Sequence, residues 1–198
     1  FSASPYVTES WPDNVVIFRE PEWTAHAVPG KDLVVHGFGF DQYEVSRNPF
    51  GALRVPSDGL WHVAVAHGTE RGHQPPDGKT YAPFDAVEAA APGLAYLALG
   101  HFHAMTRIIG DFQTVMCYSG APEGLDFGET GPRYYLEVEL GEAGVSVTPV
   151  RSARVLYAVC SIDCTGFTSS QQVIDAIRAW RPDDGVPRLA RVTLTGAC

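Results

Sequence analysis

Short apolar runs, separated by turns rich in Gly, Pro and charged residues, cover most of the chain. Runs at 14–18, 23–28 and 32–38 are rich in Val and aromatic residues, a composition typical of β-strands. Two later runs, 134–140 and 145–150, flank the sequence "GEAG", which predicts a hairpin turn. The pattern therefore predicts a strand-rich protein.

The run "LWHVAVAHG" at 60–68 shows the alternation of a strand most clearly. Val63, Val65 and His67 fall on one face, and the residues between them fall on the other. The run "AYLALG" at 95–100 is uniformly apolar, as in a buried strand. Each run leads into a histidine with a glycine beside it.

Two segments predict helices. In the first, Asp85 is followed three residues later by Glu88, which resembles a capping box, and Pro92 ends the helix. The second lies at 168–180, with Ser169 or Ser170 as its cap. Its apolar stripe consists of Val173, Ile174, Ile177 and Trp180. This stripe predicts that Trp180 packs in a core rather than contacting a ligand.

A change of pattern near residues 150–154 predicts a domain boundary. After it the chain reads as strand, helix and strand, a β-α-β unit with which an appended α+β domain would begin. We therefore predict a first domain at 1–150 and the start of a second at 151–198. Phe1 is not an initiating Met, and the chain stops just after a strand-like run. Both ends look cut, so we expect a fragment of a longer protein.

Composition narrows the class of protein. The 198 residues are 45% apolar and 19% charged, which is typical of a globular protein and not of a disordered one. No apolar run approaches the roughly 20 residues of a membrane span. The formal net charge of −9 argues against a protein that coats nucleic acid with a basic surface, so any contact with DNA would be local. Four cysteines without a zinc-type spacing favour reduced thiols in a cytoplasmic protein.

Three histidines at strand ends are the candidate chemistry. His101 and His103 are two residues apart, so in an extended chain their rings point the same way. His67 ends its strand as His101 does, and neighbouring strands would deliver all three rings to one rim. Imidazole binds Mn, Fe and Zn, so a metal site at His67, His101 and His103 is one hypothesis. A structural or surface role for the "HFH" pair is the alternative.

The order of three motifs resembles a known family. The sequence "WHVAVAHG", then "LALGHFH", then "YSGAPEGLDFGE" (118–129) and the hairpin after it are similar to the SbcD-type DNA repair exonucleases of the calcineurin-like metallophosphoesterases. The resemblance covers nearly the whole chain. It implies part of a β-sandwich of the four-layer αββα type, followed by a small α+β capping domain. It also implies two divalent metal ions, usually Mn with Fe or Zn as alternatives. His67 and His101 would bind one ion, and His103 the other.

The sequence departs from this family at its start. The family's early motifs, D-x-H, G-D and G-N-H-D, are absent, and with them four of seven metal-binding positions. Carboxylates offset the charge of two dications about 3.5–4 Å apart, and three neutral imidazoles do not. We therefore expect the parent protein to be a metal-dependent nuclease and this chain alone to be inactive, with a partial or empty metal site.

The resemblance also suggests partners. DNA is the expected substrate of the parent protein, with a coiled-coil ABC-type ATPase as a candidate subunit. A homodimer is a further candidate, because strands that lose neighbours become exposed edges. Two other functions stay open. One is a calcineurin-like phosphoesterase acting on nucleotides or other small phosphoesters, and the other is a β-rich interaction module without catalysis. Tyr118 is a candidate for stacking on a base, although the loop at 118–129 is favoured as a structural brace.

Overall fold

The computed structural model describes residues 5–42, 45–73, 78–181 and 184–197. In chain order these residues form α1 (Pro5–Thr8), β1 (Trp23–Ala27), β2 (Leu33–Phe38), η1 (Phe50–Ala52), β3 (Trp61–His67), α2 (Ala86–Ala89), β4 (Leu94–Gly100), β5 (Thr106–Ile108), β6 (Val115–Tyr118), β7 (Tyr134–Gly141), β8 (Gly144–Arg151), β9 (Leu156–Asp163), α3 (Ser170–Trp180) and β10 (Arg188–Thr195). Strands predominate, as predicted, and the class is strand-rich α+β. No helix in the described ranges is long and apolar enough to cross a membrane.

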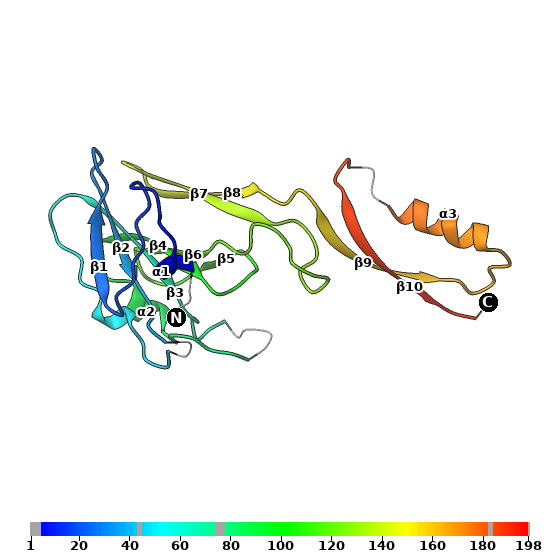
Figure 1. Cartoon of the computed structure of the whole chain (residues 1–198), viewed down its shortest axis with the longest axis horizontal. Helices are drawn as coiled ribbons and strands as arrows, with labels where there is room; N and C mark the ends of the chain where they lie inside the picture. Colours follow the sequence, from blue (N-terminus) through cyan, green and yellow to red (C-terminus); the bar gives the residue numbers. More distant parts are fainter. Residues whose placement is uncertain (1–4, 43–44, 74–77, 182–183, 198) are drawn as a thin grey trace. The chain divides into compact units, whose positions relative to one another are not determined.

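A six-stranded mixed sheet forms the first part of the chain, in the order β1-β2-β3-β4-β6-β5 (Figure 1). The four central strands β2, β3, β4 and β6 run parallel, and the edge strands β1 and β5 are antiparallel to their neighbours. The carboxyl ends of the central strands consequently lie at one edge of the sheet. Catalytic residues in parallel sheets collect at such an edge.

One face of this sheet carries the main hydrophobic core. Ala64 and Ala66 of β3 are buried there, as the alternation in "LWHVAVAHG" predicts, together with Leu97 and Leu99 of β4. Residues of η1, α2 and the connections around them cover this face. The buried residues of the core are Phe50, Leu53, Ala64, Ala66, Phe84, Ala89, Ala91, Leu94, Leu97, Leu99, Ile108, Met116 and Tyr118.

The opposite face of the sheet is less covered. Val65, which points to this face, keeps 47% of its surface exposed. The segment after α1 crosses here, and Phe18 occupies the space above Gly37, where a Cβ atom would overlap the phenyl ring. Gly37 therefore admits the aromatic side chain that partly covers this face.

The strand predicted at residues 14–18 does not form. The segment has no regular secondary structure, and Val15 and Val16 are 38% and 44% exposed. The Val15 N–H donates to the Pro12 carbonyl in a turn, and the Gly39 N–H donates to the Glu20 carbonyl just after the run. The apolar residues at 14–18 thus belong to a coil beside the sheet, whereas β1 takes the edge position. The runs at 23–28, 32–38 and 95–100 and the hairpin form strands as predicted.

The predicted β-α-β unit is present as β9, α3 and β10. The two strands pair in parallel, from Leu156 opposite Arg188 to Asp163 opposite Thr195. Ser169 caps α3, and the side chain of Gln172 completes a capping box. One side of the helix packs on the strands, and Trp180 joins this small core as expected. Ile174 of the predicted stripe is 42% exposed, and Ala176 takes its place against the strands.

The chain separates into two compact units. The first comprises residues 1–120 and 136–148, and the second comprises 121–135 and 149–198. The predicted catalytic and capping domains, with their division at 150, stay a prediction. So does the second sheet of the αββα sandwich, because the described residues form one six-stranded sheet and two two-stranded sheets. The second unit includes a segment at 121–135 that the sequence pattern did not assign to it.

Candidate functional site

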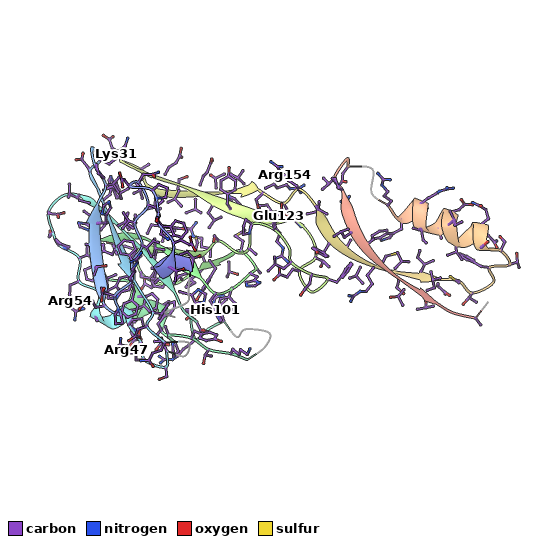
Figure 2. All side chains as sticks on the ribbon, viewed as in Figure 1. Lys31, Arg47, Arg54, His101, Glu123 and Arg154 are labelled. Atoms are coloured by element: carbon purple, nitrogen blue, oxygen red, sulfur yellow. The ribbon has the colours of Figure 1, made fainter. Side chains whose placement is uncertain are left out.

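The predicted histidines lie where the carboxyl ends of the parallel strands meet. His67 is the last residue of β3, and His101 follows the last residue of β4. The register pairs His67 with Gly100, so the histidine of one strand lies beside the glycine of the next. His101 is labelled in Figure 2. Two parallel strands therefore deliver their histidines to one rim, as the sequence predicts.

Gly100 makes room for the His67 ring. A Cβ atom at position 100 would lie 3.0 Å from Nδ1 of His67, closer than such contacts normally come. The glycine that precedes "HFH" thus serves the histidine of the neighbouring strand. Because position 100 has no side chain, the His67 ring can rest against the end of β4.

His101 has a strained backbone. Its φ of 124° lies in a region that residues with a side chain rarely adopt. Such a conformation costs on the order of 1–3 kcal/mol and persists where the surrounding structure enforces it. Here it turns the chain sharply at the end of β4, immediately before Phe102 and His103. Strain of this kind is typical of positions at which a side chain is held for function.

His103 is positioned by a second glycine. Gly120 has a φ of 79°, and a Cβ atom there would lie 2.8 Å from both the His103 carbonyl oxygen and the Met105 amide nitrogen. The "YSG" segment after β6 therefore fits directly against the turn that carries His103. The first part of the "YSGAPEGLDFGE" motif thus shapes the backbone of the histidine pair.

The three rings are close enough to affect one another. The ring centroids of His67 and His101 are 5.3 Å apart, with an interplanar angle of 68°. His67 keeps an exposed surface, but partial desolvation by its neighbours lowers its pKa below the usual value, and the proximity of His101 and His103 lowers it further. A low pKa favours the neutral imidazole, which is the form that binds a metal ion.

These residues fit part of a metal site. The two neighbouring imidazoles of His67 and His101 are suited to share one ion of the Mn, Fe or Zn type. Throughout 5–42, 45–73, 78–181 and 184–197, no three His, Cys, Asp or Glu side chains are placed together to hold a metal ion. Three imidazoles also carry no charge to offset two dications. The described residues therefore fit a pair of ligands and do not by themselves fit a complete two-metal centre.

Aromatic side chains surround the two histidine rings. Phe40, just after β2, lies 6.3 Å from the His67 ring, and Phe102 lies 5.0 Å from the His101 ring. Tyr81 approaches both rings, at 6.5 Å from His67 and 5.3 Å from His101. Sequence reasoning missed these residues. Phe102 adjoins His101 in the sequence, whereas Phe40 and Tyr81 lie in loops and only the fold brings them to the rim.

Tyr118 is a brace in this structure. The side chain is fully buried, its hydroxyl donates to the Gly68 carbonyl at 2.8 Å, and it accepts from the Glu70 N–H at 3.0 Å. Its ring also meets Phe102 edge-on, with centroids 4.6 Å apart. Burial accordingly raises the pKa of the phenol. This placement favours the bracing role and leaves no ring surface for stacking on a base.

The rest of the "YSGAPEGLDFGE" motif folds with the second unit. The Glu123 carboxylate accepts from the Arg154 N–H at 2.8 Å, and both residues are labelled in Figure 2. The Phe127 ring meets the Tyr157 ring edge-to-face. The Arg191 guanidinium of β10 lies over the Phe127 ring, 4.2 Å from its centroid. The loop, favoured from the sequence as a structural brace, packs through Phe127 against the β9–β10 sheet. The carboxylates of Glu123, Asp126 and Glu129 accept backbone N–H groups within this unit.

Two further histidines form a separate cluster. His36 of β2 and His62 of β3 share a hydrogen bond of 2.9 Å between Nε2 and Nδ1, and His62 Nε2 lies 2.9 Å from an Asp58 carboxylate oxygen. Both imidazoles are buried on the core face. Burial lowers the pKa of His36, and the neighbouring His62 adds to this effect. The pair belongs to the packing of the sheet.

A groove of about 940 Å³ opens beside His67. The ends of β2, β3, β4 and β6 line it, together with the segment at 15–19, and its walls are largely apolar. Asp41 is the acidic residue among those described that line the groove. The groove thus joins the less covered face of the sheet to the histidine rim.

Comparison with known proteins agrees with the superfamily that the motifs suggest. No family model matches the chain. The chain is 27% identical over 195 residues to a Bacillus subtilis (strain 168) protein named as an uncharacterized metallophosphoesterase, YhaO. The similarity covers 94% of this chain and 46% of that protein, so the chain spans about half the length of its relative. This similarity supports the metallophosphoesterase superfamily.

Proposed function

We propose that this chain supplies the histidine side of the metal site in a metal-dependent phosphoester hydrolase. The observation that carries the proposal is the convergence of His67 and His101, from the ends of adjacent parallel strands, on one rim. The similarity to a metallophosphoesterase supports it independently. Divalent ions in such a site polarise the phosphoryl group and activate a water molecule.

In the proposed reaction, the residues of this chain bind and orient. His67 and His101 hold one ion, and His103 is the candidate ligand of a second. The strained turn at His101 sets the direction of the backbone that carries one ring, and the space at Gly100 leaves room for the other. Preorganised ligands pay less ordering cost on binding, which strengthens the site.

For the substrate, we propose the phosphodiester bonds of DNA, cleaved as by an SbcD-type repair exonuclease. The support is the ordered set of motifs, from "VAVAHG" through "LALGHFH" to "YSGAPEGLDFGE". Nucleotides or other small phosphoesters are the second candidate, because a net charge of −9 disfavours a broad DNA-binding surface. In either case the proposed ions are Mn, with Fe or Zn as alternatives.

We further propose that the chain alone does not hydrolyse phosphoesters. The histidines offer no negative charge to offset two dications, so the remaining ligands must come from residues outside this set. Binding of one ion by the isolated chain is accordingly expected to be weak. For the whole protein we propose a cytoplasmic location, DNA as substrate, and a coiled-coil ABC-type ATPase or a second copy as candidate partners.

Manganese titration calorimetry tests the ligand assignment. The unchanged chain is compared with the triple variant His67→Ala, His101→Ala, His103→Ala, and with His26→Ala as a control on β1. We expect weak binding that the triple variant loses and the control keeps. Equal binding by all three proteins would refute the assignment.

The substrate is then tested on the longer protein that contains this chain. Hydrolysis of linear duplex DNA and of bis(p-nitrophenyl) phosphate is measured with and without Mn²⁺. Metal-dependent cleavage of DNA is expected. Cleavage of the small diester alone would favour the second candidate, and hydrolysis without metal would contradict both.

A further inference from the structure

Tyr81 lies against both histidine rings, at the third corner of a triangle of ring centroids, and its backbone is fixed by its own loop. Its amide N–H donates to Oγ1 of Thr69 at 2.9 Å, and its carbonyl accepts from the Thr69 N–H at 2.8 Å. Thr69 is buried, with 2% of its surface exposed. The tyrosine backbone is therefore tied in both directions to the loop that follows His67.

The next residue secures this position further. Ala82 is fully buried and has a φ of 40°, a left-handed conformation that is uncommon for a residue with a side chain. Its N–H donates to the Val45 carbonyl. A Cβ atom on Gly68 would lie 2.9 Å from the Ala82 carbonyl oxygen, so the two loops are in tight contact. The backbone at 81–82 is held on three sides.

The Tyr81 ring meets both histidine rings nearly edge-on. The interplanar angles are 71° with His67 and 73° with His101, at centroid distances of 6.5 Å and 5.3 Å. Edge-to-face pairs of aromatic rings at 4.5–7 Å are favourable by about 0.5–1.5 kcal/mol beyond their buried area. Of this histidine pair, Phe40 contacts His67 and Phe102 contacts His101, whereas Tyr81 contacts both rings.

We propose that Tyr81 is a positioning residue for the metal ligands His67 and His101, acting through its ring rather than its hydroxyl. The inference rests on the proposed function, because it takes these two histidines as ligands. A ring whose backbone is held in place, packed against both imidazoles, restricts the rotamers that each can adopt. Groups that hydrogen-bond to metal-ligating histidines and orient them typically contribute about 10–100-fold to metal affinity, and for orientation by packing we expect the lower end of that range.

Four variants test the proposal. Tyr81→Phe keeps the ring and loses the hydroxyl, Tyr81→Leu keeps the apolar volume and loses the ring, and Tyr81→Ala loses both. Tyr135→Ala removes a 45% exposed tyrosine elsewhere in the chain and serves as the control. Thermal melting of each variant identifies any that fails to fold. If Tyr81→Ala does not fold, the conclusion is drawn from Tyr81→Leu alone.

Two measurements are made on each variant. In manganese titration, Tyr81→Phe and Tyr135→Ala should bind as the unchanged chain does, and Tyr81→Leu and Tyr81→Ala should bind about ten-fold more weakly. In NMR spectra of the metal-free chain, the Hα–Hβ couplings of His67 and His101 should report one rotamer in the unchanged chain and averaged rotamers in Tyr81→Leu and Tyr81→Ala.

The two measurements separate this inference from the proposed function. If the unchanged chain binds no manganese, the ligand assignment fails, and averaged couplings in Tyr81→Leu would still establish the positioning role. Single-rotamer couplings in Tyr81→Leu would overturn that role. Equal manganese affinity in Tyr81→Leu and the unchanged chain would overturn its importance for metal binding.

Discussion

At the scale of single residues, the site depends on backbone conformations that ordinary side chains avoid. His101 takes up a φ of 124°, and Ala82 one of 40°. Both positions adjoin the rings of the candidate metal site. A protein retains such strain where function requires it and where neighbouring contacts outweigh its cost. Stability and ligand geometry are therefore in conflict at His101.

This conflict gives a prediction for position 101. His101→Gly should be more stable than His101→Ala by about 1 kcal/mol, because glycine adopts this φ without strain. The order is the reverse of the usual preference for alanine over glycine in regular structure. Urea unfolding of both variants measures the difference. An alanine variant as stable as the glycine variant would show that the backbone relaxes when the imidazole is removed.

The buried pair of His36 and His62 gives a prediction for pH. His36 has a lowered pKa in the folded protein because burial and the neighbouring His62 disfavour its charged form. The Asp58 carboxylate has a smaller effect in the opposite direction and raises the pKa. Below about pH 6.5 the unfolded chain binds the proton more readily, so stability falls as the pH falls. Above pH 6.5 both states are neutral at this residue, and its contribution is constant.

Chemical unfolding of the unchanged chain and of His36→Gln, from pH 5 to pH 8, measures this effect. The unchanged chain should lose more stability between pH 7 and pH 5 than the variant does. Identical slopes in the two proteins would show that His36 does not couple folding to protonation.

At the scale of elements, glycines set the distances between strand ends and turns. Gly100 leaves space for the His67 ring, and Gly120 allows the turn after β6 to approach His103. Neither role is visible in the sequence, in which both are ordinary glycines after apolar strands. The geometry of the rim thus depends on residues that carry no chemistry themselves.

Gly120 gives a prediction with a matched control. Gly120→Ala should destabilise the protein by about 1–3 kcal/mol, because the new Cβ atom meets backbone atoms and the φ is left-handed. Gly30 has a similar φ of 71° but no atom within 4 Å of a Cβ at that position. Gly30→Ala should therefore cost less than Gly120→Ala, by urea unfolding. Equal costs would mean that backbone strain alone, and not the contact with His103, matters at position 120.

The helix α3 gives a prediction about its cap. Ser169→Ala should lower stability by about 1 kcal/mol, because the side chain of Ser169 accepts a backbone N–H in the first turn. Ser170→Ala, one residue inside the helix, should have little effect. Urea unfolding followed by circular dichroism compares the two. A larger loss for Ser170→Ala would place the cap one residue later.

At the scale of the whole molecule, two compact units with separate cores lead us to expect two unfolding transitions. Ile162→Ala, in the core beneath α3, should shift one transition by about 2–4 kcal/mol and leave the other in place. Leu97→Ala, in the core of the large sheet, should shift only the other. A single transition that moves with either substitution would show that the units unfold together.

The sequence predicted most of the strands, both helix caps and the convergence of His67 with His101. These features follow from local periodicity and from the rule that parallel strands end at one edge. It did not predict the coil at 14–18, whose apolar side chains resemble those of a strand although no neighbouring strand pairs with it. It also could not place Tyr81, because contact between a loop at 81 and a strand end at 101 depends on the tertiary fold.

The space at Gly100 also bears on how such sequences can diverge. Because the His67 ring rests beside the place where a side chain at position 100 would lie, a substitution at position 100 requires the ring to move or to become smaller. A smaller residue at position 67, by contrast, leaves glycine acceptable at position 100. Among related sequences, a side chain at position 100 should therefore accompany a residue smaller than histidine at position 67 more often than glycine does.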